Sequence, residues 1–584
     1  MANISTIIKA LCNRRSHLLV ALVSAGLLGA NAQENLRQEI TVTHHEEVKP
    51  TDAVRLNVSP TVSMPALASQ KLDYSMRQIR VGVPATLSTL SPASYADSIY
   101  RSPYRGYAAA GYLPMLNLGA AAGYKFIDND RVRLNGWMQY DGTSYRGDLA
   151  DFARVSRGES MRVRRNTVTV GGALHSAVGR QSFLDFGIDY TFARFNTPSL
   201  EGSENQNVHR LNLQGLWTMD TGKWDTGIGI DYGHFAYGNT VTFHESPFVP
   251  APAAPRTLRP ARENKVSLLA FASGKIWGAE AAGMEVKASY LNYGNHAEAV
   301  ETRSGRSLEP MGSFSHALIS LRPYYRTTWM NVNFDLGMNI DFTINNGKAF
   351  HISPAAQATW KPSGFVTVYI KANGGEHQNT LGSLYNATYY TIPNMAYGNS
   401  HLPLDGEVGV TVGLFKGFYS EISAGYAIAN DWLMPVALWD NVSSFEKVNM
   451  KGYKLHLGLG YRYRDLVEVS LTGEMAPRKY DRGYYLWRDR ARYVADATLR
   501  VTPIEPLDVS LSWNYRGSRC QVDYTGAPHS LGNINSLGLG AVYRLTPQWS
   551  IFGKAENLLN HRYNLIGGVP AEGIRGLVGA TYKF

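Results

Sequence analysis

A period-two alternation of apolar and polar residues constrains this chain more than any other feature, and it recurs from about residue 104 to the end. Between 453 and 463 the odd positions are Tyr or Leu, and the even positions are polar residues or glycine. The stretch 507–516 repeats the pattern. Because successive strand side chains point to opposite faces, each segment predicts a β-strand with one apolar and one polar face. Strands buried on both faces would be apolar throughout.

Two folds fit such strands: a soluble antiparallel sheet with one wet face, and a transmembrane barrel with lipid outside and water inside. The positions of aromatic residues distinguish the two folds. Tyr453, Tyr461 and Tyr463 sit near the ends of one apolar face, and Trp513 and Tyr515 near the end of another. Outer-membrane barrels carry rings at both membrane interfaces, whereas soluble sandwiches bury them in mid-core. The pattern favours the barrel.

Composition excludes a helical membrane protein. Mean hydropathy is -0.22, and past residue 32 no stretch approaches the roughly 18 uninterrupted apolar residues of a spanning helix. Charged residues make up 18% of the chain, below the roughly 25% of soluble proteins. The net charge of +10 does not by itself indicate nucleic-acid binding, and we expect none for an exported barrel.

The connections between predicted strands alternate in length, as in bacterial barrels, with short turns on one side and long loops on the other. Counting them predicts about 22 antiparallel strands in 104–584, with both ends on the short-turn side. The predicted short turns are 128–130, 179–180, 220–223, 277–281, 361–364, 416–417, 464–465, 502–506 and 546–548. The predicted long connections are 142–163, 196–207, 239–263, 295–313, 376–404, 430–451, 476–487 and 518–534.

The first 32 residues have the features of a secretory signal peptide. Basic residues precede an apolar run at 18–29, and Ala30-Asn31-Ala32 forms a small-x-small cleavage pattern. Cleavage before Gln33 leaves Cys520 as the only cysteine, which excludes an internal disulfide. We therefore expect an exported protein in the outer membrane of a Gram-negative bacterium, in contact with lipid and lipopolysaccharide.

The last strand has one apolar face that ends in an aromatic residue. Such a strand resembles the C-terminal signal by which the barrel-assembly machinery recognises outer-membrane proteins. The residues that carry this prediction are Val578, Ala580, Tyr582 and Phe584.

The C-terminal region resembles the last two strands of the TonB-dependent receptors. That family ends in an Asn-Leu-Phe/Leu-Asn-x-x-Tyr element, a loop with Pro and Gly, and a terminal Tyr-x-Phe. The matching positions are Asn557, Leu558, Leu559, Asn560, Tyr563, Pro570, Gly573, Tyr582 and Phe584. The resemblance implies a 22-stranded barrel that takes up solutes across the outer membrane, and it covers roughly 104–584.

The N-terminal region departs from that family. Its members carry a plug domain of at least about 100 residues, whereas only 71 residues (33–103) precede the first predicted strand here. We expect a short extended periplasmic or lumenal segment in place of a full plug. Part of it resembles the TonB box, which pairs with TonB by adding a strand to its sheet. The matching residues are Glu39, Ile40, Thr41, Val42 and Thr43.

A 22-stranded barrel has a wide lumen that is normally filled. Three elements could fill it: the segment 33–103, long loops such as 376–404 and 239–263, or a partner protein. The sequence leaves two functions open. One is solute uptake with coupling through TonB. The other is a plugless scaffold or subunit of an envelope complex, with 33–103 docking another envelope protein.

No catalytic, cofactor or metal motif stands out, and we do not expect an enzyme. The run 44–47 (HHEE) fits a solvated linker better than a metal site, because neighbouring residues on an extended chain point to opposite sides. Two basic clusters lie in predicted long connections, where Arg could bind lipopolysaccharide phosphates or an anionic ligand. Their candidate residues are Arg162, Arg164, Arg165, Arg488, Arg490 and Arg492.

Overall fold

The computed structural model describes residues 103–584, apart from fourteen short ranges. These ranges are 114–116, 149–159, 200–201, 244–255, 259, 277–280, 295–299, 302–306, 309–313, 392–397, 438–442, 481–490, 523–527 and 566–568. The predicted signal peptide (1–32) and the predicted N-terminal segment up to residue 102 lie outside the described residues. In the part that is described, no helix is long and apolar enough to cross a membrane.

One antiparallel sheet makes up the wall, and each strand pairs with its neighbour along the chain. Its first eleven strands are β1 (Gly106–Leu113), β2 (Asn117–Asp128), β3 (Val132–Asp148), β4 (Ser160–Ala177), β5 (Ser182–Ser199), β6 (Gly202–Asp220), β7 (Trp224–Tyr237), β10 (Arg262–Gly274), β11 (Ala281–Gly294), β14 (Phe314–Trp329) and β15 (Val332–Ile344).

The remaining wall strands are β16 (Phe350–Ser363), β17 (Val366–His377), β18 (Ser400–Phe415), β19 (Phe418–Ala437), β20 (Ser443–Tyr463), β21 (Val467–Met475), β22 (Arg478–Tyr480), β23 (Tyr493–Ile504), β24 (Leu507–Gly517), β27 (Ile534–Arg544), β28 (Trp549–Glu556) and β29 (Arg575–Lys583). The sheet has 23 strands, but β21 and β22 pair with successive parts of β20 and share one wall position. The wall therefore has 23 - 1 = 22 positions, and the predicted strand number is confirmed.

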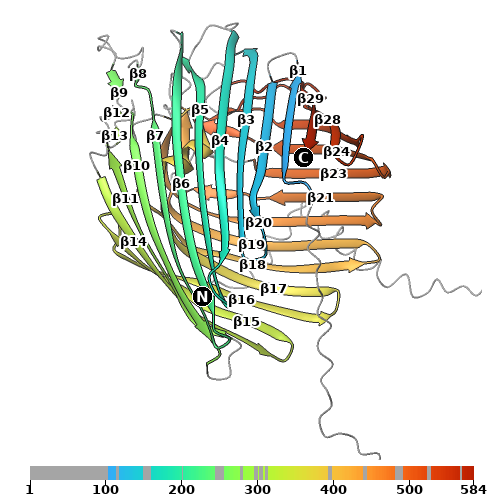
Figure 1. The fold of residues 1–584 in the computed structure, drawn as a ribbon. Coiled ribbons are helices and arrows are strands. Elements are labelled where there is room, and N and C mark those ends of the chain that lie inside the picture. Colours follow the sequence, from blue (N-terminus) through green and yellow to red (C-terminus); the bar gives the residue numbers. More distant parts are fainter. Residues whose placement is uncertain are drawn as a thin grey trace, which may run out of the picture. The chain divides into compact units, whose positions relative to one another are not determined.

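Pairing between the first and last strands closes the sheet into a barrel. Six residue pairs join β1 to β29, from Tyr107↔Lys583 to Tyr112↔Val578, and Figure 1 shows the blue β1 beside the red β29. The carbonyl oxygen of Phe584 also accepts hydrogen bonds from the backbone N–H groups of Arg105 and Gly106, both 2.8 Å long. The terminal residue thus helps to close the wall.

Smaller elements lie in the long connections. Three short hairpins pair β8 (Val241–Phe243) with β9 (Arg256–Leu258), β12 (Val300–Glu301) with β13 (Ser307–Leu308), and β25 (Cys520–Val522) with β26 (Pro528–Ser530). The short helix α3 (Leu381–Ala387) lies between β17 and β18.

Strands extend into three of the predicted long connections. The predicted loop 196–207 is wrong, because β5 and β6 continue pairing to Ser199↔Gly202. The predictions 142–163 and 430–451 place the strand ends too early for the same reason, since pairing continues to Asp148↔Ser160 and Ala437↔Ser443, with 149–159 and 438–442 outside the described residues. Backbone pairing depends little on side-chain polarity, so strands can extend into polar hairpins after the apolar face has ended.

One hairpin turn has no clear signal in the sequence. Met330 and Asn331 join β14 to β15 with φ values of 47° and 62°. A two-residue type I′ turn needs positive φ at both positions, which usually selects Asn and Gly. Met330 is uncommon there, and this turn is absent from the predicted set. The predicted short turns lie at junctions between consecutive wall strands.

The outer face of the wall is apolar and carries aromatic residues next to the short turns. Large exposed side chains flanking these turns or the chain end include Phe126, Trp224, Trp329, Phe415, Phe418, Tyr461, Tyr463, Trp549 and Phe584. On β20, Tyr453 is 66% exposed and marks the other end of the apolar band. Eight residues separate Tyr453 from Tyr461, or about 21 Å along the membrane normal at about 3.4 Å per residue and about 40° tilt. This agrees with a membrane-spanning band of about 25 Å.

The inner face carries polar side chains that pair with one another. Lys454 Nζ lies 2.7 Å from Asp405 Oδ1 and 2.8 Å from Glu407 Oε2, and Lys371 Nζ lies 3.2 Å from Glu407 Oε1. Tyr369 donates a hydrogen bond of 2.8 Å to Glu407. Pairing lowers the cost of holding these charges in a confined lumen.

The close approach of β29 to β1 predicts that a side chain larger than hydrogen at Gly579 destabilises the barrel. A methyl group there would collide with the carbonyl oxygen of Ala110 and lie 2.6 Å from Gly111 Cα. We expect Gly579→Ala to lower the free energy of unfolding by about 1–3 kcal/mol, as overpacking does. Gly553→Ala is the control, because no atom lies within 4 Å of its added methyl group. Urea unfolding of the detergent-solubilised barrel measures both; equal midpoints would contradict this account of the seam.

Candidate functional site

A segment between β17 and β18 folds into the barrel, and we call it the inner loop (residues 378–391). It contains α3, which Thr380 caps by accepting a hydrogen bond from Ser383 N. The side chain of Ser383 in turn accepts one from Thr380 N. A capping box of this kind satisfies backbone donors at the start of a helix. Leu381, Leu384 and Tyr385 of α3 are buried.

Wall strands β10 and β11 hold the start of the inner loop by polar contacts. Glu263 Oε2 accepts a hydrogen bond from Leu381 N, the first residue of α3. Tyr293 Oη donates a 2.9 Å hydrogen bond to the carbonyl oxygen of Asn379. Ser289 Oγ donates one of 3.0 Å to Gln378 Oε1. A carboxylate beside a helix N-terminus is favourably placed, because unpaired N–H groups point towards it.

The inner loop crosses the bore. On one side, the ring of Phe195 on β5 lies 6.0 Å from Tyr385 and 6.1 Å from Tyr390. On the other, Ser443 N on β20 donates a 2.6 Å hydrogen bond to the carbonyl oxygen of Tyr390. β5 is the fifth wall position and β20 the sixteenth, and 16 - 5 = 11 is half of 22. These contacts therefore join opposite walls.

The inner loop shares a hydrophobic cluster with the wall. Its buried members come from the inner loop, from β4, β5, β6, β7, β11, β19 and β20, from the residue before β10 and from the connection after β28: Val163, Ala193, Phe195, Val208, Phe235, Tyr237, Ala261, Leu291, Tyr293, Leu381, Leu384, Tyr385, Tyr390, Leu433, Phe445 and Val569. Apolar burial stabilises such a cluster by about 25 cal/mol per Å². The inner loop is thus packed as a core element rather than lying as a solvated loop.

Arg165 brings a positive charge to the inner loop. Its guanidinium lies 3.9 Å from the ring centroid of Tyr389, a cation–π contact. Burial raises the pKa values of Tyr385 and Tyr390, and the positive charge of Arg165 opposes both shifts. Both phenols therefore remain neutral at physiological pH.

The connection 557–574 forms a second inward contact, and it contains the motif shared with the receptor family. Asn557 and Asn560 have positive φ values of 51° and 48°. Asn557 Nδ2 donates to the carbonyl oxygens of His561 and Glu572, at 3.2 and 3.1 Å. The asparagines of the motif thus shape the turn. Tyr145 Oη donates a 2.8 Å hydrogen bond to the carbonyl oxygen of Pro570.

The predicted basic residues lie on different surfaces. Arg162 and Arg164 are exposed and alternate with the buried Val163, so they face outward from β4, and Arg165 faces the bore. Arg492 is half-buried, with its guanidinium 5.5 Å from the Tyr493 ring centroid. Arg488 and Arg490 lie outside the described residues, as do residues 39–43. Contact of Arg162 and Arg164 with lipopolysaccharide stays a prediction.

The residues of the predicted insertion signal lie on β29 and at its end. Val578 is 58% exposed on the outer face, and the Tyr582 ring lies 4.6 Å from that of Trp549 and 5.9 Å from that of Phe584. Ala580 pairs with Ala110 across the seam. Recognition by the assembly machinery stays a prediction.

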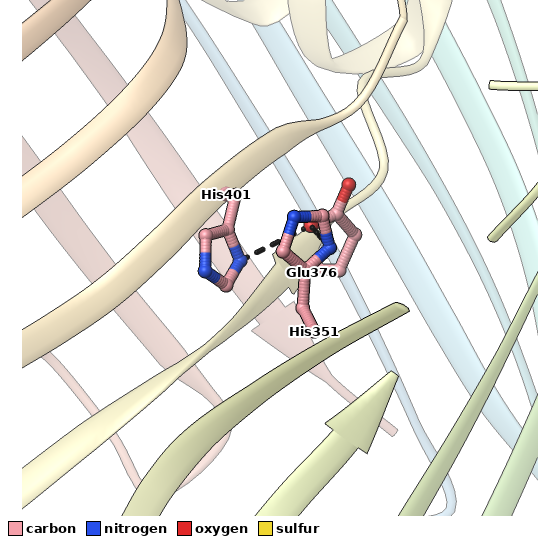
Figure 2. A group of neighbouring side chains, drawn as sticks. All are labelled: His351, Glu376 and His401. Carbon is pink, nitrogen blue, oxygen red and sulfur yellow. Dashed lines mark ion pairs between the residues drawn. The ribbon is translucent and has the colours of Figure 1, made fainter. Parts of the chain in front are cut away.

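Three titratable residues that sequence analysis did not select also meet on the inner face. His351, Glu376 and His401 come from β16, β17 and β18 (Figure 2). Successive members are 25 residues apart in the chain, much farther than the few residues that separate ligands in local metal motifs, so the sequence alone did not reveal them. In the described part of the chain this is the one group of three or more His, Cys, Asp or Glu whose ligand atoms lie close enough to hold a metal.

No family model matches the chain. Among solved structures, the chain is similar to the ferric enterobactin receptor PfeA of Pseudomonas aeruginosa, with a TM-score of 0.60, 11% identity and coverage of 82% of this chain and 80% of that one. The siderophore receptor PirA of Acinetobacter baumannii gives the same values. The iron transporter FrpB of Neisseria meningitidis gives a TM-score of 0.63 at 10% identity, covering 83% of this chain and 81% of that one.

These likenesses, with the closed 22-position wall and its apolar exterior, define the class of protein. The chain is a closed β-barrel with the fold of the TonB-dependent receptors, and the resemblance seen at its C-terminus is confirmed at the level of the fold. The similar structures are receptors and transporters rather than enzymes.

The contact between Glu263 and Leu381 predicts how firmly the inner loop is held. Glu263→Ala leaves a buried N–H group without its acceptor, at a cost of about 1–3 kcal/mol. We expect amide hydrogen exchange in residues 381–391 to become about tenfold faster or more. Glu263→Gln is the control, because it keeps an acceptor oxygen and should exchange more slowly than the alanine variant. Unchanged exchange in Glu263→Ala would show that the apolar cluster alone holds the loop.

Proposed function

We propose that this barrel takes up a solute across the outer membrane and that the inner loop controls passage through it. The observation that carries this proposal is the span of the inner loop from β5 to β20, opposite positions of the wall. A scaffold has no need of a core-like element across its bore. A transport path of this width needs a closure.

Two features support movement of the inner loop. Its polar anchors to the wall are few, and the wall remains paired up to the loop, since His377↔Ser400 is a registered pair. A loop attached in this way can leave the bore while the wall stays intact. Such closing elements move on the μs–ms timescale in other proteins.

The solute class is proposed by analogy of fold alone. The similar structures are receptors for ferric enterobactin or other siderophores and an iron transporter, so a ferric chelate is the first probe for binding. The predicted TonB box, Glu39–Thr43, would supply energy coupling. Lack of a full plug in 33–103 is part of this proposal and places the closing role on the inner loop.

Single-channel conductance in KCl tests the closing role directly. The comparison uses the mature protein, a variant lacking 33–103, a variant with 381–390 replaced by a Gly-Ser linker, and the double variant. We expect low conductance wherever the inner loop is present and a large steady conductance in the double variant. Heat-modifiable electrophoretic migration establishes that each variant is folded.

Two results would overturn the proposal. If the variant lacking 33–103 conducts as strongly as the double variant, the inner loop does not close the bore. If no variant conducts, the barrel is closed by other means and the scaffold function gains support. In the scaffold case, deletion of 33–48 should dissolve an envelope complex rather than abolish uptake.

A further inference from the structure

Three potential metal ligands converge on the inner face beside the base of the inner loop. Glu376 Oε2 lies 3.4 Å from His351 Nδ1 and 3.2 Å from His401 Nδ1. The two imidazole rings are stacked, with centroids 4.0 Å apart and planes inclined by 21°. All three ligand atoms lie within 4.8 Å of one another. Figure 2 shows the three side chains close together, with dashed lines marking the ion pairs from each histidine to the carboxylate.

The chain geometry at Glu376 departs from strand alternation. Lys371 faces the lumen, where it pairs with Glu407, so strict alternation along β17 would turn Glu376 outward. The β17–β18 register breaks between Asn373 and Gly375, and Gly375 has a φ of 142°. This break turns Glu376 inward to His351, whose chain neighbours Phe350 and Ile352 are exposed on the outer face. Bulges often re-aim a side chain at a functional site.

The converging atoms contact one another. His351 Nδ1, Glu376 Oε2 and His401 Nδ1 are buried, and apart from the two ion pairs that join them none makes a hydrogen bond within the described chain. The Glu376 side chain is only 5% exposed. Buried polar atoms with few partners cost free energy, and these three face one point where both imidazoles depend on a single carboxylate oxygen. A cation at that point would satisfy all three.

From this geometry we infer a binding site for a divalent transition-metal ion, with Zn²⁺ or Fe²⁺ as the chemical class, held by His351, Glu376 and His401. Imidazole nitrogen and carboxylate oxygen bind such ions at about 2.0–2.2 Å. Tetrahedral ligands at that range are about 3.3–3.5 Å apart, and the two ion-pair separations are 3.4 and 3.2 Å. Two histidines and one carboxylate leave coordination positions open.

The surroundings suit a cation and connect the site to the inner loop. Asp341 on β15 is registered with His351 and its Oδ2 accepts a 2.9 Å hydrogen bond from Glu376 N. Glu376 and His401 are themselves a registered pair on the strands that enter and leave the inner loop. A bound ion would therefore join three strands at the base of that loop. The inference stands on these residues and does not depend on what the barrel transports.

Titration of the full-length protein with Zn²⁺, and with Co²⁺ for its visible absorption spectrum, tests the site. We expect one ion per chain, a Co²⁺ spectrum of nitrogen and oxygen ligation, and at least about tenfold weaker binding in Glu376→Gln and in His401→Gln. Slower amide exchange in residues 377–391 on Zn²⁺ addition would locate the ion at the loop base. Mg²⁺ should not compete, because it prefers all-oxygen ligands.

His175→Gln is the matched control. His175 Nδ1 lies 2.6 Å from Asp185 Oδ1 in an ordinary hydrogen-bonded pair without a second imidazole, so its loss should leave Zn²⁺ affinity unchanged. The inference is overturned if the wild-type protein binds neither ion stoichiometrically. Equal affinity in Glu376→Gln, His401→Gln and the wild type would also overturn it. Metal titration tests the binding site, and single-channel conductance of the same variants tests the closing role of the inner loop. Failure of one proposal can therefore be told apart from failure of the other.

Discussion

Backbone pairing between β1 and β29 is the constraint on which the rest of this structure depends. A strand in lipid has no water to satisfy its N–H and C=O groups, so a sheet can span the membrane only when it has no edge. The six residue pairs of the seam remove that edge. Gly579 allows the close approach, and the chain end at Phe584 extends the pairing. The polar lumen and the inner loop exist only because the wall is closed in this way.

The closed wall creates a second physical problem, which is an interior too wide for its own side chains to fill. Charged groups on the inner face are held in networks such as Lys454 with Asp405 and Glu407. The inner loop fills part of the space with a packed apolar cluster that reaches both sides of the wall. Its attachment combines a stiff core with a few polar anchors, and this combination is what suits it to a closing role.

The inner loop and the triad of His351, Glu376 and His401 are adjacent along the chain and in space. The triad occupies the strands that enter and leave the loop. Metal binding at this place would stiffen the base of the loop without touching its apolar cluster. The two proposals can be tested separately. Together they describe a closing loop with a metal site on the strands at its base.

Strand alternation and turn spacing were enough to predict the barrel, its strand number and its apolar exterior, because a period of two depends only on local backbone geometry. The Asn-Leu-Leu-Asn motif likewise pointed to the receptor fold, since its turn is set by its own residues. Tertiary structure alone decided that the inner loop crosses the bore, because that depends on contacts with strands eleven positions apart. It also decided that His351, Glu376 and His401 meet. A break in register turns Glu376 inward, against the alternation that the sequence implies.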